Sequence, residues 1–314
     1  MDKKIYRLGV IGSGRIARRF VPEARLIDGI EVAAAYNPRI TSAKKFAEEL
    51  NIEYATDDIS DFIEKVDAVY IATPHETHVG YCRQMLESGK HVLCEKPMSF
   101  SEKEARELFA IADEKGLILM EAMKTAYCPG FKALLDVVKS GKIGRVVDVE
   151  ACFSRITPVD VREMKDQTYG GSFTEFGSYT LLPIVKILGT KDISTNTWAL
   201  KGETGVDVYT KTSIDYGTAI GLAKTGLAAK SEGQLVIAGT EGYILVPSPW
   251  WLTKYFEVRY EDPNRVDKHI HPFDGQGLRY EVQEFVDRMN GSTKVSLSEE
   301  ESIWFAKQME TYLG

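Results

Sequence analysis

Short apolar runs alternate with helix-forming segments over the first 122 residues of the chain. After an apolar strand that begins four residues into the chain, we predict buried strands at residues 30–36, 53–56, 68–72, 91–94 and 117–122. Between them we predict helices at residues 41–50, 77–88 and 101–115. Strands that alternate with helices in this way are typical of a doubly wound parallel sheet. We therefore expect an α/β domain over residues 1–122, with its ligand at the carboxyl ends of the strands.

The hydrophobic pattern changes after residue 122, where longer segments alternate apolar with polar positions. We predict strands at residues 146–154, 193–201, 206–216, 234–238 and 255–260. We predict helices at residues 131–139, 178–188, 278–290 and 298–313. Such alternation is typical of an antiparallel sheet that has one face in water. Residues 123–314 are therefore expected to form a second, α+β domain around an open, mostly antiparallel sheet.

Composition agrees with a soluble protein of two domains. Lys and Arg number 39 against 46 Asp and Glu, a net charge of −7, so neither nucleic acid nor an anionic membrane is an expected partner. No apolar stretch approaches the roughly 18 residues that a membrane span needs. The chain has no Cys-x-x-Cys pair, so we expect neither a structural zinc site nor a framework of disulfide bonds. We expect a reducing, cytoplasmic location instead. The four cysteines are Cys82, Cys94, Cys128 and Cys152.

The sequence Gly12-x-Gly14-x-x-Ala17 follows the first apolar strand. A glycine turn between a strand and a helix leaves backbone N–H groups at the positive end of the helix, where they suit a pyrophosphate. Gly12 would make the turn, Gly14 would let the backbone approach the phosphates, and Ala17 would let the helix pack on the strand. We expect three other residues of this turn to bind the cofactor as well: Ser13, Arg15 and Ile16. Similar turns also occur as plain structure.

The second predicted strand ends before Asn37 and Arg39, where a residue that recognises the adenosine ribose is expected about 20 residues beyond the glycine turn. An acidic residue there would accept hydrogen bonds from the ribose hydroxyls and would repel a 2′-phosphate. Asn37 is neutral, and Arg39 can bind a phosphate through charge-assisted hydrogen bonds. The pair therefore favours NADP over NAD. The alternative is a plain turn with a solvated arginine.

Two further strand ends carry polar groups at the ligand edge of the predicted sheet. The turn after residues 68–72 contains groups that could line the cofactor, namely Thr73, Pro74, His75 and His78. The two histidines could equally be ordinary helix-start residues. After residues 91–94 come Glu95, Lys96 and Pro97. Because Lys is seldom placed at the inner end of a buried strand without a partner, Lys96 is a candidate for chemistry beside the nicotinamide.

Together these motifs resemble those of the glucose–fructose oxidoreductase / inositol dehydrogenase / MocA (Gfo/Idh/MocA) family, over nearly the whole chain. The motifs fall in the family's order and spacing: the glycine turn, Thr73-Pro74 with His78, Glu95-Lys96-Pro97, Glu121-Ala122 and Gly141-Lys142-Ile143-Gly144. The resemblance implies an amino-terminal NAD(P)-binding Rossmann domain and a carboxy-terminal domain whose open sheet covers the nicotinamide. It also implies a homodimer or homotetramer built through that sheet.

A second family motif is expected at the head of a helix in the second domain. There this chain reads Gly170-Gly171-Ser172-Phe173-Thr174-Glu175-Phe176-Gly177-Ser178-Tyr179. Tyr179 replaces a histidine of inositol dehydrogenase-like members and resembles the branch with dimeric dihydrodiol dehydrogenase and NADP-dependent xylose dehydrogenase, which again implies NADP. Glu175 stands for the usual aspartate, and Ala126 for an arginine common in that branch. The residues expected to contact substrate are Lys124, Tyr127, Arg155 and Glu175.

The resemblance implies hydride transfer between nicotinamide and a carbinol carbon of a sugar, polyol or dihydrodiol. We expect Tyr179 to be the acid/base group and Lys96 to donate to the same substrate oxygen. The ordinary pKa values of the two groups, about 10 and 10.4, are too high for neutral pH. A cationic Lys96 would lower the pKa of the phenol. Two other functions stay open: a non-catalytic NADP-binding regulator, and an NAD-dependent glycosidase on the same fold.

Two remaining pairs of aromatic and imidazole side chains have alternative interpretations. Trp250 and Trp251 lie beside prolines and could stack on a sugar face or simply pack. His269 and His271 alternate, so they share one face of a strand, but no third ligand is evident. We therefore expect no metal site.

Overall fold

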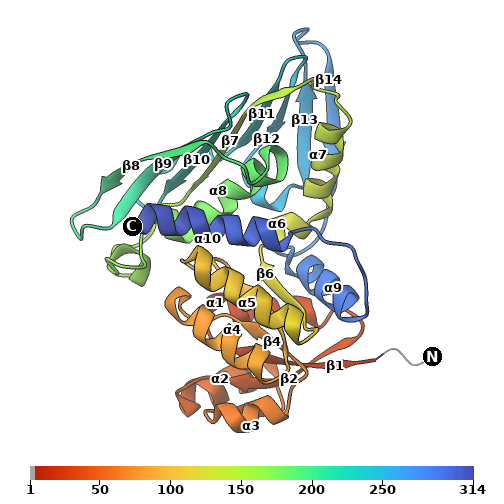
Figure 1. Cartoon of the computed structure of the whole chain (residues 1–314), viewed down its shortest axis with the longest axis vertical. Coiled ribbons are helices and arrows are strands. Elements are labelled where there is room, and N and C mark those ends of the chain that lie inside the picture. Colours follow the sequence, from red (N-terminus) through yellow and green to blue (C-terminus); the bar gives the residue numbers. More distant parts are fainter. Residues whose placement is uncertain (1–3) are drawn as a thin grey trace. The chain divides into compact units, whose positions relative to one another are not determined.

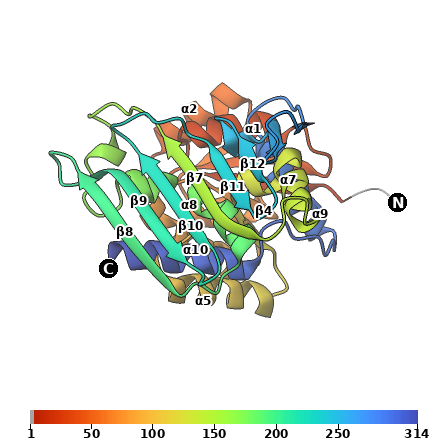
Figure 2. The same cartoon turned by 90° about the horizontal axis from the view of Figure 1, so that it is seen from above.

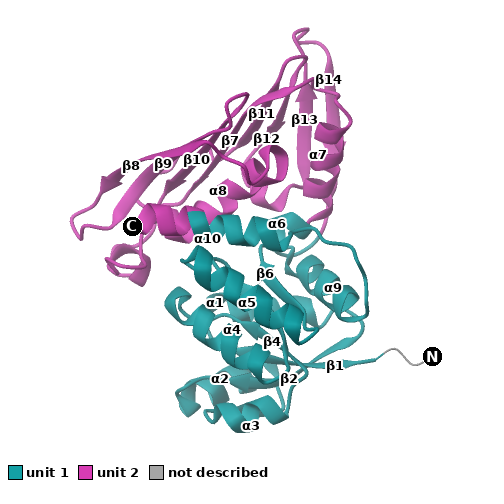
Figure 3. Ribbon diagram, viewed as in Figure 1, with its two compact units in different colours: residues 1–127, 274–307 teal, residues 128–273, 308–314 magenta. Residues whose placement is uncertain are grey.

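The computed structural model describes residues 4–314, which contain a parallel sheet and a mixed sheet, each with helices packed on it (Figure 1). The chain divides into two compact units (Figure 3). Unit 1 comprises the residues up to Tyr127 and Asp274–Lys307, and unit 2 comprises Cys128–Phe273 and Gln308–Gly314. Residues 1–3, which the sequence analysis assigns to the first domain, lie outside the described range.

Unit 1 is built on the parallel sheet, whose strand order is β3-β2-β1-β4-β5-β6. Its strands are β1 (Tyr6–Ile11), β2 (Ile30–Tyr36), β3 (Tyr54–Thr56), β4 (Ala68–Ile71), β5 (His91–Glu95) and β6 (Leu119–Ala122). The order reverses between β1 and β4, so the carboxyl ends of these strands border the crevice in which open α/β sheets bind ligands. The doubly wound sheet predicted from the sequence is confirmed.

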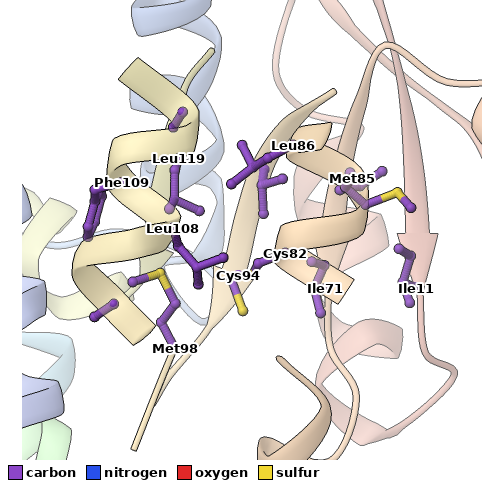
Figure 4. Close-up of a cluster of buried hydrophobic side chains, with 14 of the residues drawn as sticks. Ile11, Ile71, Cys82, Met85, Leu86, Cys94, Met98, Leu108, Phe109 and Leu119 are labelled. Carbon is purple, nitrogen blue, oxygen red and sulfur yellow. The ribbon is translucent and has the colours of Figure 1, made fainter. Parts of the chain in front are cut away.

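Helices cover both faces of the parallel sheet. One face carries α1 (Arg15–Ala24), α2 (Ile40–Leu50) and α9 (Leu278–Met289), and the other carries α3 (Ile59–Glu64), α4 (His78–Glu87) and α5 (Glu102–Glu114). The apolar core on the second face includes Ile71, Cys82, Leu86, Cys94 and Leu108 (Figure 4). Ile303 and Ala306, from the first part of α10 (Glu299–Leu313), also belong to this core. A late segment of the chain thus completes the core of unit 1.

Unit 2 is built on the mixed sheet, whose strand order is β14-β13-β12-β11-β7-β10-β9-β8. Its strands are β7 (Val146–Ser154), β8 (Ser194–Lys201), β9 (Asp207–Asp215), β10 (Ile220–Gly226), β11 (Leu235–Gly239), β12 (Tyr243–Val246), β13 (Tyr255–Arg259) and β14 (Val266–Ile270). β7 and β10 pair in parallel, whereas the other neighbours are antiparallel. The helix α8 (Ser172–Leu188) packs on this sheet through β7, β9 and β10 (Figure 2). The helix α7 (Pro129–Lys139) precedes β7.

Five elements of the structure are absent from the sequence-based prediction: α3, α6 (Lys124–Tyr127), β10, β12 and β14. In addition, α8 begins six residues before its predicted start at residue 178. The strand β10 was not predicted because its glycines have no side chains to contribute to an alternating apolar and polar pattern. A Cβ on Gly221 would lie 2.5 Å from Ile184 Cγ2, so packing of α8 requires glycine there. Within the described residues, no helix combines the length and apolar character needed to cross a bilayer.

Candidate active site

The glycine turn lies between β1 and α1, at the carboxyl edge of the parallel sheet. Gly12 has a φ of +102°, and a Cβ there would lie 2.4 Å from Ala72 O, so the turn requires glycine. A Cβ on Gly14 would meet nothing within 4 Å, whereas Ala17 is fully buried. The turn is therefore open in front of the first turn of α1, which Arg15 begins and whose N–H groups point out of the helix.

Asn37 connects the glycine turn to the end of β2. Its Nδ2 donates to Ser13 Oγ at 3.0 Å, and its Oδ1 accepts from the backbone N–H of Arg39 at 3.0 Å. The Arg39 side chain itself is exposed. Ser13, Asn37 and Arg39 thus form one hydrogen-bonded edge that begins at the glycine turn.

The buried imidazole of His78 joins two other strand-end turns. Its Nδ1 lies 2.8 Å from Pro97 O, and its Nε2 lies 3.0 Å from Thr73 O. Burial lowers the pKa of His78 to about 4, so the ring is neutral at pH 7 and donates to one of the two carbonyls. His75, which follows Pro74, lies beside it with ring centroids 5.7 Å apart. His78 therefore holds the turn after β4 against the turn after β5.

Lys96 is buried at the end of β5, with 8% of its surface exposed. The carboxylate of the preceding Glu95 accepts from the hydroxyl of Tyr70 at 2.5 Å and from the backbone N–H of Lys96 at 3.2 Å. Burial raises the pKa of Glu95, and the charge of Lys96 counteracts that rise. The peptide bond between Lys96 and Pro97 is cis. The lysine thus follows directly after a buried carboxyl group.

Two of the predicted substrate contacts, Lys124 and Tyr127, lie on the short helix α6 (Lys124–Tyr127), and both are buried in unit 1. The hydroxyl of Tyr127 donates to Glu121 O at 3.0 Å. Lys124 interacts electrostatically with Glu95 and with Glu281 of α9. Burial raises the pKa of Glu121 to about 7. The interior of unit 1 therefore holds several carboxyl groups together with Lys96 and Lys124.

In unit 2, the helix α8 presents Glu175 and Tyr179, which are one turn apart and share a helix face. Both side chains are half-buried. The Tyr179 ring centroid lies 5.3 Å from that of Phe153. Phe153 is in turn stacked between Phe176 at 4.2 Å and Trp251 at 3.7 Å. An aromatic stack of these three rings, which the sequence did not predict, thus lies beside Tyr179.

Arg155, another predicted substrate contact, also lies at this aromatic stack. Its guanidinium carbon is 5.3 Å from the Phe176 ring centroid, and its Nε donates to Thr157 Oγ1 at 3.2 Å. Unit 2 therefore brings Tyr179 and Arg155 to the same group of rings.

The two tryptophans differ in their environments. Trp250 is fully buried, and its Nε1 donates to Cys152 O at 2.8 Å, so it packs in the interior. Trp251 is half-buried and belongs to the aromatic stack. His269 and His271 lie against the ring of Phe256, with centroids 4.4 Å and 5.9 Å away. Across residues 4–314, no cluster of three or more His, Cys, Asp or Glu is arranged to hold a metal ion.

Asp207, at the start of β9, is a buried residue that the sequence analysis missed. Its Oδ2 accepts from Ser172 Oγ at 2.6 Å, from the backbone N–H of Phe173 at 3.0 Å and from Thr210 Oγ1 at 2.7 Å. It thereby satisfies the N-terminus of α8, which has no capping side chain of its own. A Cβ on Gly171, whose φ is +111°, would lie 1.8 Å from Asp207 Oδ1. No local pattern could have indicated this cap, because it comes from a strand beyond the helix.

Family models match both parts of the chain. One, an oxidoreductase family with an NAD-binding Rossmann fold, matches residues 6–123, and a GFO/IDH/MocA C-terminal domain matches residues 131–245. The chain is 30% identical to scyllo-inositol 2-dehydrogenase (NADP(+)) IolU of Bacillus subtilis, with 97% of this chain and 95% of that protein covered. It is 28% identical to trans-1,2-dihydrobenzene-1,2-diol dehydrogenase of Sus scrofa, with 95% and 93% covered.

Solved structures show the same fold. The crystal structure of KijD10, a 3-ketoreductase from Actinomadura kijaniata in complex with NADP and TDP-benzene, superposes with a TM-score of 0.85. The identity is 23%, and the match covers 98% of this chain and 97% of the other. At this identity the likeness establishes the arrangement of the elements.

Removal of the cap on α8 is expected to destabilise unit 2. In Asp207→Ala, the buried donors of Ser172, Phe173 and Thr210 lose their acceptor, so we expect the free energy of unfolding to fall by about 2–3 kcal/mol. Urea unfolding measures this change. In the control Asp262→Ala, an exposed carboxylate that accepts from Asn264 in a turn is removed, with an expected loss below about 0.5 kcal/mol. Equal losses in the two variants would contradict the capping role.

Proposed function

The chain belongs to the Gfo/Idh/MocA oxidoreductase family, and from this premise we propose that it transfers a hydride between NADP and a carbinol carbon of a ring with vicinal hydroxyl groups. It is an NAD(P)-dependent oxidoreductase that acts on CH–OH groups. The observation that carries the proposal is the half-buried Tyr179, which lies against the aromatic stack on the capped helix α8. The buried Lys96 at a strand end of unit 1 supports it.

The residues around the glycine turn fit a dinucleotide. The positive φ of Gly12 and the open space at Gly14 leave the N-terminus of α1 accessible to phosphates. Bound NADP supplies a hydride donor or acceptor at nicotinamide C4. The proposed cofactor-binding residues are Gly12, Ser13, Gly14, Arg15, Ile16, Asn37, Arg39, Thr73, Pro74, His75, His78, Glu95 and Lys96. Of these, His78 would act by holding its two turns rather than by direct contact, because it is fully buried.

Lys96 and Tyr179 are the proposed catalytic residues. Lys96 donates a hydrogen bond to the substrate oxygen and stabilises the negative charge that develops there. Ionised Tyr179 takes the hydroxyl proton at its Oη during oxidation and becomes a neutral phenol, and that phenol gives the proton back during reduction. Glu175, on the same face of α8 as Tyr179, and Arg155 are proposed to bind neighbouring hydroxyl groups.

The proposed substrate is a cyclic diol, polyol or sugar. The names of two relatives, a scyllo-inositol 2-dehydrogenase and a trans-1,2-dihydrobenzene-1,2-diol dehydrogenase, both specify rings with hydroxyl groups on adjacent carbons. The stack of Phe153, Phe176 and Trp251 beside Tyr179 offers flat apolar surface to such a ring. Lys124 and Tyr127 are buried in unit 1, so we assign them to the support of the site rather than to direct contact with the ring.

We also propose a homodimer or homotetramer formed through the outer face of the mixed sheet. Trp198, Leu200 and Ile220 are 63%, 67% and 53% exposed, and the strand register places them on one face. Apolar groups that gather on one sheet face mark a protein interface. A cytoplasmic location is likewise proposed, on the ground that the four cysteines are all buried and unpaired.

Substitution of either proposed catalytic residue should abolish or strongly reduce turnover. We expect Tyr179→Phe to lower kcat by about 10²–10⁴, because the proton carrier is lost. We expect Lys96→Met to remove turnover, with a loss of NADPH affinity that is far smaller than the loss of turnover. Absorbance of the nicotinamide, followed with a panel of inositols, aldoses and a trans-dihydrodiol, measures turnover, and fluorescence titration measures binding. Near-normal kcat in both variants would overturn the assignment.

Arg39 should decide between the two cofactors. We expect Arg39→Ala to raise the Kd for NADPH about tenfold or more, because a charge-assisted hydrogen bond to the 2′-phosphate is lost. The Kd for NADH should stay unchanged. Lys44→Ala, which removes another exposed cation from α2, is the matched control and should change neither Kd. An equal rise for NADPH and NADH would rule out 2′-phosphate recognition by Arg39.

A charge on the outer sheet face should break the assembly. We expect Leu200→Glu to shift the protein from a dimer or tetramer to a monomer in size-exclusion chromatography with light scattering, because burial of an unpaired carboxylate is costly. Leu26→Glu, at a residue of unit 1 that is 59% exposed, should leave the mass unchanged. A wild-type protein that is already monomeric would refute the proposed interface.

A further inference from the structure

The carboxyl group of Glu281 is buried inside unit 1 without a hydrogen-bond partner. Its side chain is 0% exposed, and among residues 4–314 neither of its oxygens has a partner. Nearly all buried polar groups in proteins are hydrogen-bonded, so an exception of this kind calls for an explanation. An ionised carboxylate in such surroundings is strongly disfavoured.

Charged groups from three other elements face Glu281. They are Lys124 on α6, Glu95 at the end of β5 and Glu23 on α1. Burial, and next the charge of Glu95, raise the pKa of Glu281 well above its usual range, whereas Lys124 opposes this rise. Glu23 already accepts hydrogen bonds from the backbone and Nε of Arg279. Lys124 and Glu95 connect Glu281 to the proposed site, because Glu95 also interacts with Lys96.

Two other titratable groups complete these surroundings. Tyr127 on α6 interacts electrostatically with Glu281 and with Glu284 of the same helix α9. Its hydroxyl donates to a backbone carbonyl, and burial raises its pKa well above 10, so it stays neutral. Glu284 accepts from the backbone N–H of Ser296 at 2.6 Å. Tyr127 therefore adds no charge beside Glu281.

The proton on Glu281 contributes to the net charge around Lys124 and Glu95, and Glu95 in turn interacts with Lys96. Glu95 accepts hydrogen bonds from Tyr70 and from the backbone of Lys96, which stabilises its charged form. With Glu281 neutral, the positive charges of Lys96 and Lys124 exceed the negative charge of Glu95. With Glu281 ionised, these four groups would cancel, and Glu121, which interacts with Lys96 and has a pKa of about 7, would add further negative charge. A positive interior favours negative charge on an oxygen bound to Lys96.

We propose that Glu281 is a positioning residue that keeps its proton and thereby leaves a net positive charge around Lys96 and Lys124. This inference rests on the proposed function, in which Lys96 stabilises a developing negative charge on the substrate oxygen. The competing interpretation is an ionised Glu281 that serves only as a structural ion-pair partner of Lys124.

Stability against pH tests the proton without any substrate. Glu281→Gln and Glu281→Met both remove the titrating group while keeping its approximate size, and the second variant guards against a folding defect in the first. Because the pKa of Glu281 is raised in the folded state, wild-type stability falls relative to either variant as pH rises from 5 to 8. We expect the folding equilibrium constant to fall by up to about tenfold per pH unit relative to the variants. Urea unfolding at pH 5, 6.5 and 8 measures this difference.

The pH profile of kcat, measured with the substrate panel, tests the role in the reaction. We expect Glu281→Gln to keep wild-type kcat at pH 6–7 and to retain it to higher pH, because the variant cannot ionise. The matched control is Glu284→Gln on the same helix, which should lower stability but leave the pH profile of the wild type.

The outcomes separate the two proposals. A variant whose stability deficit grows with pH would show an ionised, paired Glu281 and overturn the inference, whatever the panel shows. The expected stability curve together with an unchanged pH profile would also overturn it, since the proton would then have no role at Lys96. A wild-type protein that turns over no member of the panel would contradict the proposed function, while the stability curves would still decide the protonation of Glu281.

Discussion

The cost of burying charged groups governs the carboxyl edge of the parallel sheet. A buried charge must be paired and hydrogen-bonded, or else the group must become neutral. The carboxyl group of Glu95 accepts hydrogen bonds from Tyr70 and from the backbone of Lys96. His78 is neutral instead, because burial lowers its pKa. The same hydrogen bonds hold the turns after β4 and β5 in place. Lys96 therefore sits in a framework whose geometry and charge arise from one physical requirement.

Unit 2 meets a related requirement at the N-terminus of α8. The buried N–H of Phe173 must find an acceptor, and Asp207 supplies it from β9. Gly171 leaves the space that the carboxylate occupies. A helix whose first turn is held in this way keeps Tyr179 in a defined place beside Phe153, and defined placement is what acid/base chemistry needs.

Local sequence patterns predicted much of the fold. The strands of the parallel sheet are apolar runs bounded by turn residues, and their alternation with helices reflects the connections that parallel strands require. Prediction was weaker in the mixed sheet, where β14 is largely polar and β10 contains Gly221. These strands form because their neighbours supply hydrogen bonds and packing, and neither contribution is visible in the isolated segment.

The sequence by itself determined the glycine turn, the lysine after a buried strand and the motif that contains Tyr179, because each depends on residues close together in the chain. The tertiary structure decided which distant residues support them. It brought Asp207 to α8, Trp251 to Phe153 and Glu281 to Lys124. It also made His78 an internal clamp. The physical reason is that burial, hydrogen-bond partners and local charge arise from the packing of separate elements, and linear spacing does not encode them.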